Sequence, residues 1–190
     1  MPHTQSSPLP STAAVFPEIS GEHWIEPLEN GVHVLIRPLR GEDLEREKAF
    51  IKHLSPESRH FRFLCEIKEP DAAMLDQLMT VDFKQHMAYV ALAHVNGEVV
   101  EVGISRYAAS GVADQCECAV TVADDWQHHG LGSLLLNHLI DAARGNGFKE
   151  MYSLDMASNQ HMRALAQALK FKTERDPEDA TQVIHRLSLA

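Results

Sequence analysis

The most informative stretch of this chain is Ala119-Val-Thr-Val-Ala-Asp-Asp-Trp-Gln-His-His-Gly-Leu-Gly-Ser-Leu-Leu-Leu136. Its first part predicts a strand, because β-branched and apolar residues alternate with others from Cys116 onward. Its last part predicts a helix, since leucines recur at helical spacing until a Gly-Asn-Gly stop at 145–147. Between the strand and the helix lies a turn that carries Gly130 and Gly132.

A strand, a glycine-bearing turn and a helix start together predict an anion site. The first backbone N–H groups of a helix have no partner within it, and the helix dipole adds about half a positive charge there. Glycine at positions 130 and 132 removes Cβ atoms that would hold an anion away from these amides. Each charge-assisted hydrogen bond contributes about 1.5–3 kcal/mol, so a handful can hold a pyrophosphate without any lysine.

At this point the sequence resembles a known family. Gln127-x-x-Gly130-x-Gly132 after a Val-x-Val strand resembles the acyl-CoA signature of the GNAT family of N-acetyltransferases. Several segments resemble, in the same order, the bacterial protein-lysine acetyltransferase (Pat-like) branch: Arg37–Asp43, Leu54–Arg59, Arg62-Phe63, Ala123–Gln127 and Asn159-x-x-Met162. The resemblance covers roughly residues 31 to 188 and implies the GNAT fold, an α/β fold with a mixed central sheet of about six to seven strands flanked by helices.

The order of predicted elements agrees with this fold. A flexible Pro/Ser-rich leader is predicted for residues 1–30 and a single acetyltransferase domain for residues 31–190. The predicted elements are a strand at 32–37, helices between 41 and 79, three strands between 87 and 122 with an Asn96-Gly97 hairpin, the central helix, a strand at 150–156, a helix capped by Ser158, and a strand at 182–189. This order predicts a layered α/β domain independently of the motif.

Composition narrows the class of protein. The 190 residues are 44% hydrophobic, enough for a core, and no apolar run reaches about 18 residues, so no membrane span is predicted. The first residues do not form a basic region followed by an apolar stretch, so no secretory signal is predicted. The three cysteines are an odd number and favour a reducing, cytoplasmic location. The net charge of −10 argues against a nucleic-acid partner and suits a cationic amine substrate, although an acidic surface is also a common way for a protein to stay soluble.

No metal site is predicted. The 12 histidines are scattered, His128 and His129 are adjacent and point apart, and Cys116-x-Cys118 lacks zinc-site spacing. Asp124-Asp125 ahead of the turn is predicted to cap the turn rather than to hold a cation.

Glu117 is the candidate catalytic residue. Acetyl transfer from a thioester to an amine requires that the amine lose a proton, that an oxyanion be stabilised and that a thiolate leave. Glu117 lies inside an otherwise apolar strand, where partial burial would raise its pKa toward that of a useful base. The resemblance also implies a glutamate general base at this position. The alternative is an outward-facing glutamate on a half-exposed strand.

The resemblance implies that the turn and its flanks bind acetyl-CoA. The candidate residues are Val120, Val122, Gln127, His128, His129, Gly130, Leu131, Gly132, Ser133 and Asn159. A strand backbone N–H near 120–122 would meet the oxyanion. Two alternatives stay open, since a Val-x-Val pattern is also typical of a core strand and Asn159 is also a typical helix-start residue.

Two positions depart from the family pattern. Many acetyltransferases of this family have a tyrosine seven residues after the motif asparagine, and it protonates the leaving thiolate. In this chain the motif asparagine is Asn159, and the corresponding position is Ala166. Ser158, Tyr152 or a water molecule remain alternatives for this role. The second departure is Lys170-Phe171, where relatives have Gly-Phe, so the preceding helix is expected to end differently.

The sequence therefore predicts an N-acetyltransferase that moves acetyl from acetyl-CoA to a primary amine, by direct attack and without a metal, releasing CoA. A protein lysine is the favoured acceptor, because the resemblance is to that branch. A small-molecule amine and a catalytically silent, regulatory acyl-CoA-binding module are the alternatives. The resemblance adds an acyl-CoA synthetase as a candidate partner, and the sequence leaves a homodimer open.

Overall fold

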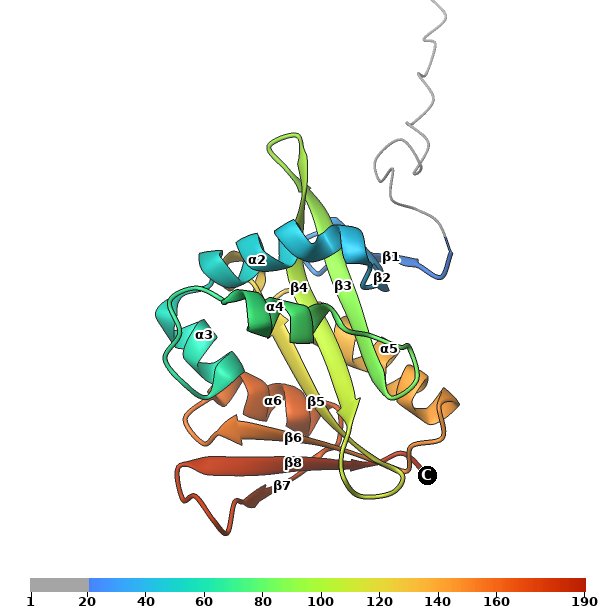
Figure 1. Ribbon diagram of the computed structural model, residues 1–190, viewed down its shortest axis with the longest axis vertical. Coiled ribbons are helices and arrows are strands. Elements are labelled where there is room, and N and C mark those ends of the chain that lie inside the picture. The colour runs from blue at the N-terminus through green and yellow to red at the C-terminus, as the bar shows by residue number, and fades with distance from the viewer. Residues whose placement is uncertain (1–20) are drawn as a thin grey trace, which may run out of the picture.

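An eight-stranded mixed sheet runs through the computed structural model, which describes residues 21–190 (Figure 1). The strands are β1 Trp24–Pro27, β2 His33–Pro38, β3 His86–Val95, β4 Glu98–Ala109, β5 Gln115–Val122, β6 Glu150–Met156, β7 Lys172–Arg175 and β8 Gln182–Ser188, in the sheet order β1-β2-β3-β4-β5-β6-β8-β7. Neighbouring strands are antiparallel except β5 and β6, which are parallel. The mixed α/β sheet expected from the sequence is therefore present, with slightly more strands than predicted.

Both additional strands lie at the edges of the sheet. β1 falls inside the predicted leader, yet it pairs with β2 from Trp24↔Ile36 to Pro27↔His33. Its Trp24 stacks on His138 of helix α5 (Leu131–Gly145) with ring centroids 3.9 Å apart, which ties the strand to the core. The predicted boundary at residue 31 is therefore too late, because ordered structure begins before it. The rest of the predicted leader, residues 1–20, lies outside the described residues.

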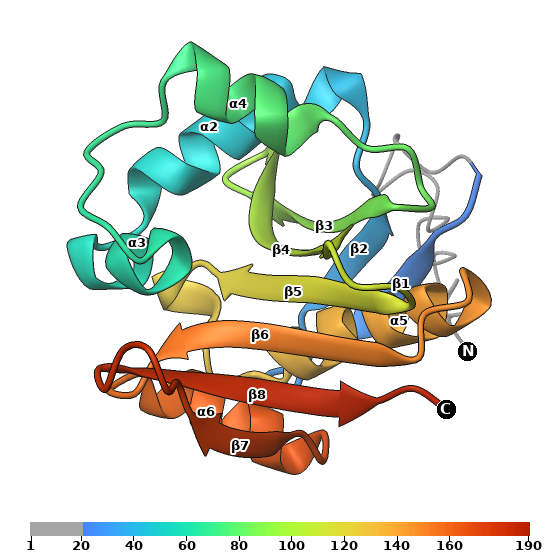
Figure 2. The ribbon, with the colours of Figure 1, turned by 60° about the horizontal axis from the view of Figure 1, so that its bottom comes forward.

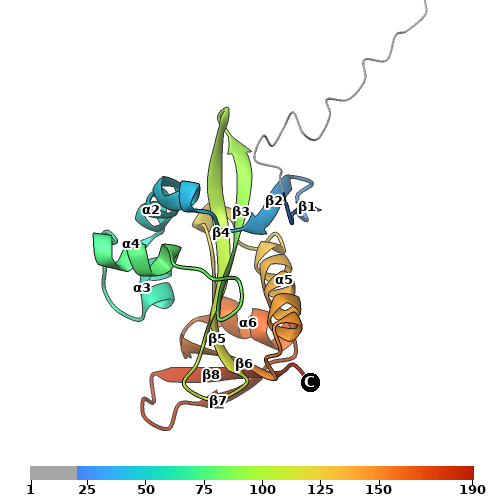
Figure 3. The same cartoon turned by 45° about the vertical axis from the view of Figure 1, so that its right-hand side comes forward.

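Helices cover both faces of the sheet. α2 Leu44–His53, α3 Pro56–Phe63 and α4 Ala72–Met79 lie on one face, and α5 Leu131–Gly145 and α6 Gln160–Ala168 lie on the other (Figure 3). Short 3₁₀ helices, η1 Gly41–Asp43 and η2 Asp124–Trp126, precede α2 and α5. Leu131, Leu135 and Leu139 of α5 are buried, as the helical spacing of its leucines predicts.

The parallel strands β5 and β6 separate along their length. Their pairing covers only Gln115–Glu117 with Glu150–Tyr152, although β5 continues to Val122 and β6 to Met156 (Figure 2). Backbone groups beyond Glu117 on β5 therefore have no partner strand on this side. The sheet opens there, next to the turn that leads into α5.

Helix α6 ends in a left-handed turn despite the missing glycine. Lys170 has φ +65°, its N–H donates to Gln167 O at 3.1 Å, and the Phe171 N–H donates to Ala166 O at 2.8 Å. This pair of bonds is the Schellman motif that normally uses glycine at the left-handed position. The expectation that the helix would end differently is therefore wrong, because lysine accepts the strained conformation that glycine would adopt freely.

Lys170→Gly is expected to raise the free energy of unfolding by about 0.5–1 kcal/mol. A side chain in the left-handed region costs about 1–2 kcal/mol, and the greater freedom of glycine in the unfolded chain offsets part of that gain. Chemical denaturation would measure the difference. Lys68→Gly is a suitable control, since Lys68 is exposed and is not among the residues with positive φ, so this variant should gain nothing. A loss of stability in Lys170→Gly would contradict the prediction.

Candidate active site

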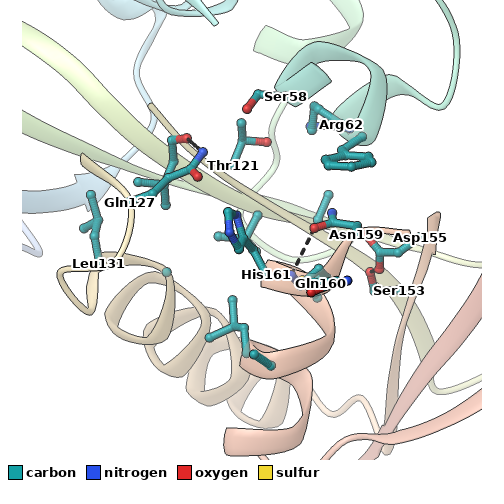
Figure 4. A pocket seen from close by; sticks show the side chains of 18 of the residues that line it. Ser58, Arg62, Thr121, Gln127, Leu131, Ser153, Asp155, Asn159, Gln160 and His161 are labelled. Carbon is teal, nitrogen blue, oxygen red and sulfur yellow. Dashed lines mark hydrogen bonds between the residues drawn. The ribbon is translucent and has the colours of Figure 1, made fainter. Parts of the chain in front are cut away.

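A cavity of about 810 Å³ lies where β5 and β6 separate. Its walls come from α3, β5, the turn before α5, the first turn of α5, the end of β6 and the start of α6 (Figure 4). Val120 and Val122 pack against the core on the α5 side. Side chains alternate along a strand, so Glu117 and Thr121 face the α3 side. Residues on both faces of the sheet therefore line one cavity.

The turn and the first turn of α5 form one wall, as the sequence predicts. Gly130 is the N-cap residue of α5 with φ +86°, and Leu131, Gly132 and Ser133 follow it along the cavity. Gln127 Nε2 donates to the Val122 carbonyl at 3.1 Å, which ties the turn back to β5. The N–H groups at the start of α5 therefore lie at the cavity wall, where they can meet an anion.

Gly132 serves packing as well as access. A Cβ atom at Gly132 would lie 3.2 Å from Leu165 Cδ2 of α6 and 3.9 Å from Val122 Cγ2. Glycine at this position therefore allows α5 to approach both α6 and β5 closely. Any larger residue would push against the wall that lines the cavity.

The two histidines of the turn differ in their surroundings. His128 lines the cavity at φ +64°, and its ring stands edge-on to His161 of α6 with centroids 4.5 Å apart. His129 does not line the cavity, in contrast to its predicted role. Its carbonyl accepts the Glu29 N–H at 3.1 Å and so joins the turn to the segment after β1. Of the ten residues predicted to bind acetyl-CoA, His129 alone lies off the cavity wall.

Asn159 has a structural task and also lines the cavity. Its side-chain oxygen accepts the Met162 N–H at 3.1 Å, so Asn159, and not Ser158 as predicted, caps α6. Asn159 therefore has the helix-capping role that was one alternative from the sequence, and it lines the cavity as well. On the same helix Ala166 is fully buried and has no group that donates a proton.

Glu117 lines the cavity from β5 and is exposed, so the predicted partial burial is wrong. The reason is that the cavity opens toward solvent on the α3 side of the strand. Tyr152 of β6, at the paired position, donates its hydroxyl to Glu117 Oε2 at 3.2 Å. Burial, reinforced by the negative charge of Glu117, raises the pKa of Tyr152, which keeps this hydroxyl a donor.

Helix α3 is fastened over the cavity by Asp124. The Asp124 carboxylate accepts the Ser55 N–H at 2.9 Å, the Ser55 hydroxyl at 2.8 Å and the Ser58 hydroxyl at 2.7 Å. Partial burial by itself would raise the pKa of Asp124, but the hydrogen bonds from Ser55 and Ser58 outweigh it and lower this pKa. The prediction that Asp124 caps its own turn is therefore wrong, because its side chain binds Ser55, the N-cap residue of α3, and Ser58 instead.

The polar residues of the cavity that were not among the predicted site residues include Arg62, Thr121, Ser153 and Asp155. Thr121 is 8% exposed and its hydroxyl has no hydrogen-bond partner within residues 21–190. Burial, and next the nearby Arg106, lower the pKa of Arg62 to about 10. Ser153 and Asp155 occupy alternate positions of β6 on its buried side, and polar residues at such positions are the signal that would have found them.

The cavity fits the acetyl donor that the motif implies. Helix N–H groups stand at one end for a pyrophosphate, Val120 and Val122 offer apolar contacts along the strand, and Thr121 offers an unpartnered hydroxyl. Within residues 21–190, no group of three or more His, Cys, Asp or Glu is arranged to hold a metal ion. None of the described helices is long and apolar enough to cross a membrane.

Comparisons with known proteins agree with this geometry. The model of the acetyltransferase (GNAT) family matches residues 49–171. Acetyltransferase PA5475 of Pseudomonas aeruginosa is 60% identical over 179 residues, covering 94% of this chain and 96% of that protein. Acetyltransferase Pat of Mycolicibacterium smegmatis is 29% identical over 143 residues, covering 75% of this chain and 42% of that protein.

Solved structures share the fold. The GNAT domain of S. lividans PAT superposes with a TM-score of 0.79 at 24% identity, covering 87% of this chain and 96% of that domain. A cAMP-binding acyltransferase from Mycobacterium smegmatis gives a TM-score of 0.61 at 24% identity, covering 89% of this chain and 48% of that protein. On the family match and the 60% identity, this chain belongs to the acetyltransferase (GNAT) family.

Proposed function

We propose that the chain transfers acetyl from acetyl-CoA to a primary amine of a protein lysine, with Glu117 as general base. The observation that carries this proposal is one cavity with helix N–H groups on one side of the sheet and a carboxylate on the other. The donor would enter from the α5 side and the acceptor from the α3 side. The two reactants would then meet in the gap between β5 and β6.

The groups around the gap support the three steps of the reaction. The N–H groups of 130–133 would hold the pyrophosphate of acetyl-CoA, and the apolar side chains of Val120 and Val122 would contact the pantetheine arm. A β5 backbone N–H left unpaired by the separation of the strands would stabilise the oxyanion. Glu117, fixed by the Tyr152 hydroxyl, would take the proton of the attacking amine.

Charge in the cavity supports a cationic acceptor. Carboxylates of Glu57, Glu117 and Asp124 line it, whereas Arg62 is the one arginine or lysine among its lining residues in the described part of the chain. A lysine ammonium would be attracted to such a surface before it loses its proton. The same argument applies to a small amine. The charge of the cavity therefore supports an amine acceptor, and the resemblance to the protein-lysine acetyltransferase branch is what favours a protein.

Acetyl transfer to three classes of acceptor tests the proposal. Radiolabelled acetyl-CoA is supplied with a lysine-containing protein, with lysine peptides and with small amines, and an acyl-CoA synthetase is the first protein to try. We expect transfer to the protein with a higher kcat/KM than to any small amine. Preference for a small amine would overturn the lysine proposal and keep the enzyme. Sedimentation of the same preparation would test the homodimer.

The second candidate is a silent acyl-CoA-binding module. Ala166, fully buried and without a donor group, favours it because the family's usual thiolate acid is missing. Calorimetric binding of acetyl-CoA without turnover on any acceptor would support this candidate. Turnover that disappears in a Glu117 variant with binding intact would exclude it.

A further inference from the structure

A buried polar chain stands behind the β6 wall of the cavity. Ser153 is 2% exposed and Asp155 is 9% exposed, and the Ser153 hydroxyl donates to Asp155 Oδ2. His185 of β8 is fully buried, with its Nε2 3.8 Å from the same Oδ2. On its other side, His185 Nδ1 shares a 2.7 Å hydrogen bond with the Thr173 hydroxyl of β7.

This arrangement leaves one carboxyl oxygen of Asp155 available. The Ser153 hydroxyl and the His185 ring both lie against Oδ2. The other oxygen, Oδ1, has no hydrogen bond within residues 21–190, and it is not fully buried. Asp155 lines the cavity next to Asn159 (Figure 4). One oxygen of Asp155 is therefore held in place while the other is presented to the cavity.

The position of Asp155 follows from the register of the parallel strands. Glu117 pairs with Tyr152, so the same offset continued past the point of separation sets Asp155 opposite Val120. Residue alternation puts these two side chains on the same face of the sheet. In the proposed function, the thioester of acetyl-CoA would lie in this gap, between Val120 and Asp155.

The surroundings of Asp155 favour a carboxyl group that keeps its proton. Burial raises the pKa of Asp155, and the negative charge of Glu117 on β5 raises it further. The hydrogen bond from Ser153 and the positive charge of Arg62 on α3 lower this pKa, but the net shift is upward. Burial, and then the charge of Arg163 on α6, lower the pKa of His185. A neutral imidazole does not hold Asp155 in its ionised form as an imidazolium would.

We propose that Asp155 is the acid that protonates the CoA thiolate as it leaves, with Ser153 and His185 as positioning residues. This inference rests on the proposed function. It also supplies the donor that is missing at Ala166, from a different element of the fold.

The proton balance of the step is complete. The neutral amine nitrogen forms a bond to the thioester carbonyl carbon, and its surplus proton goes to Glu117. When the carbon–sulfur bond breaks, its electron pair moves to sulfur and the proton on Asp155 Oδ1 transfers to it. The products are the amide, CoA as a thiol and an ionised Asp155, which regains a proton from solvent as Glu117 releases one.

The first test follows the thiol of bound CoA, which needs no acceptor. In the product complex an ionised Asp155 next to the thiol would raise the pKa of that thiol, because two neighbouring negative charges repel. In Asp155→Asn, the pH midpoint of thiolate formation, followed by ultraviolet absorbance, should fall by at least about one pH unit. Asp141→Asn on the exposed face of α5 is the control and should titrate like the wild type.

The second test follows turnover. Asp155→Asn should lower kcat by about 100-fold, a typical contribution of general-acid catalysis, and should remove the alkaline limb of the pH–rate profile. Ser153→Ala should move that limb to higher pH, because the lost hydrogen bond was lowering the pKa of Asp155. Thermal unfolding and calorimetric CoA binding would establish that both variants are folded.

The outcomes separate this inference from the function on which it rests. An unchanged thiol titration in Asp155→Asn would overturn the inference, even if kcat fell, since Asp155 would then act on the acceptor. Turnover within about threefold of wild type would overturn it as well. Failure of the proposed function has a different signature, which is wild-type protein that binds acetyl-CoA and acetylates no amine.

Discussion

Replacing Glu117 with glutamine is expected to lower kcat for amine acetylation by about 100- to 10,000-fold, the range that a general base contributes. Glutamine has the same shape and still accepts the Tyr152 hydroxyl, but it does not take a proton at neutral pH. Glu117 lies on the α3 side of β5, so the acetyl-CoA affinity measured by calorimetry should stay within about twofold of wild type.

The controls for Glu117→Gln separate chemistry from charge and from position. Glu98→Gln makes the same replacement of a carboxylate by an amide at the exposed start of β4 and should leave kcat unchanged. Tyr152→Phe removes the hydrogen bond that orients Glu117 and should cost less than the loss of the carboxylate. If Glu117→Gln kept kcat within about threefold, the base would have to be another group or solvent.

The sequence predicts local structure well where one segment contains its own signal. Asn96 and Gly97 have φ of +52° and +85°, the pair of positive values that a tight hairpin turn requires. The strand, turn and helix of 116–145 form as their alternation and spacing predict. Nine of the ten predicted acetyl-CoA residues lie on the cavity wall for the same reason, because most of them belong to one continuous motif.

Edge strands carry no comparable signal. All four residues of β7 are exposed, so no alternation of apolar side chains marks it in the sequence. β1 is equally short and follows a proline-rich segment. Both strands form because an existing neighbour offers unpaired backbone groups, which is a property of the sheet and not of the segment itself.

Contacts between distant segments explain the remaining differences at the site. Asp124 reaches Ser55 and Ser58, and Asp155 lies beside His185, so neither role appears in a local pattern. The exposure of Glu117 depends on how α3 sits over β5, and α3 is itself fastened by Asp124. A strand pattern predicts which face a residue occupies, but the elements that cover that face decide its burial.

Gly130→Glu is expected to weaken acetyl-CoA binding by at least about 100-fold. The N-cap position lies at the cavity wall next to the N–H groups that would hold the pyrophosphate. A like charge about 4 Å from a phosphate costs about 4 kcal/mol near a protein surface, which corresponds to more than a hundredfold in affinity. A Cβ atom there would lie 3.4 Å from Glu29 Oε1, and charge repulsion would drive the new carboxylate away from Glu29.

Gly130→Gln is the matched control for this effect. Glutamine imposes the same strain at φ +86° and the same contact with Glu29 but adds no charge, so it reports the cost of the backbone alone. A negative charge at a helix N-terminus favours the helix, so Gly130→Glu should unfold no earlier than Gly130→Gln. Calorimetry with both variants then isolates the electrostatic part. If the two variants bound acetyl-CoA equally, the pyrophosphate would lie away from the start of α5, and the turn would position the cofactor by shape instead of by charge.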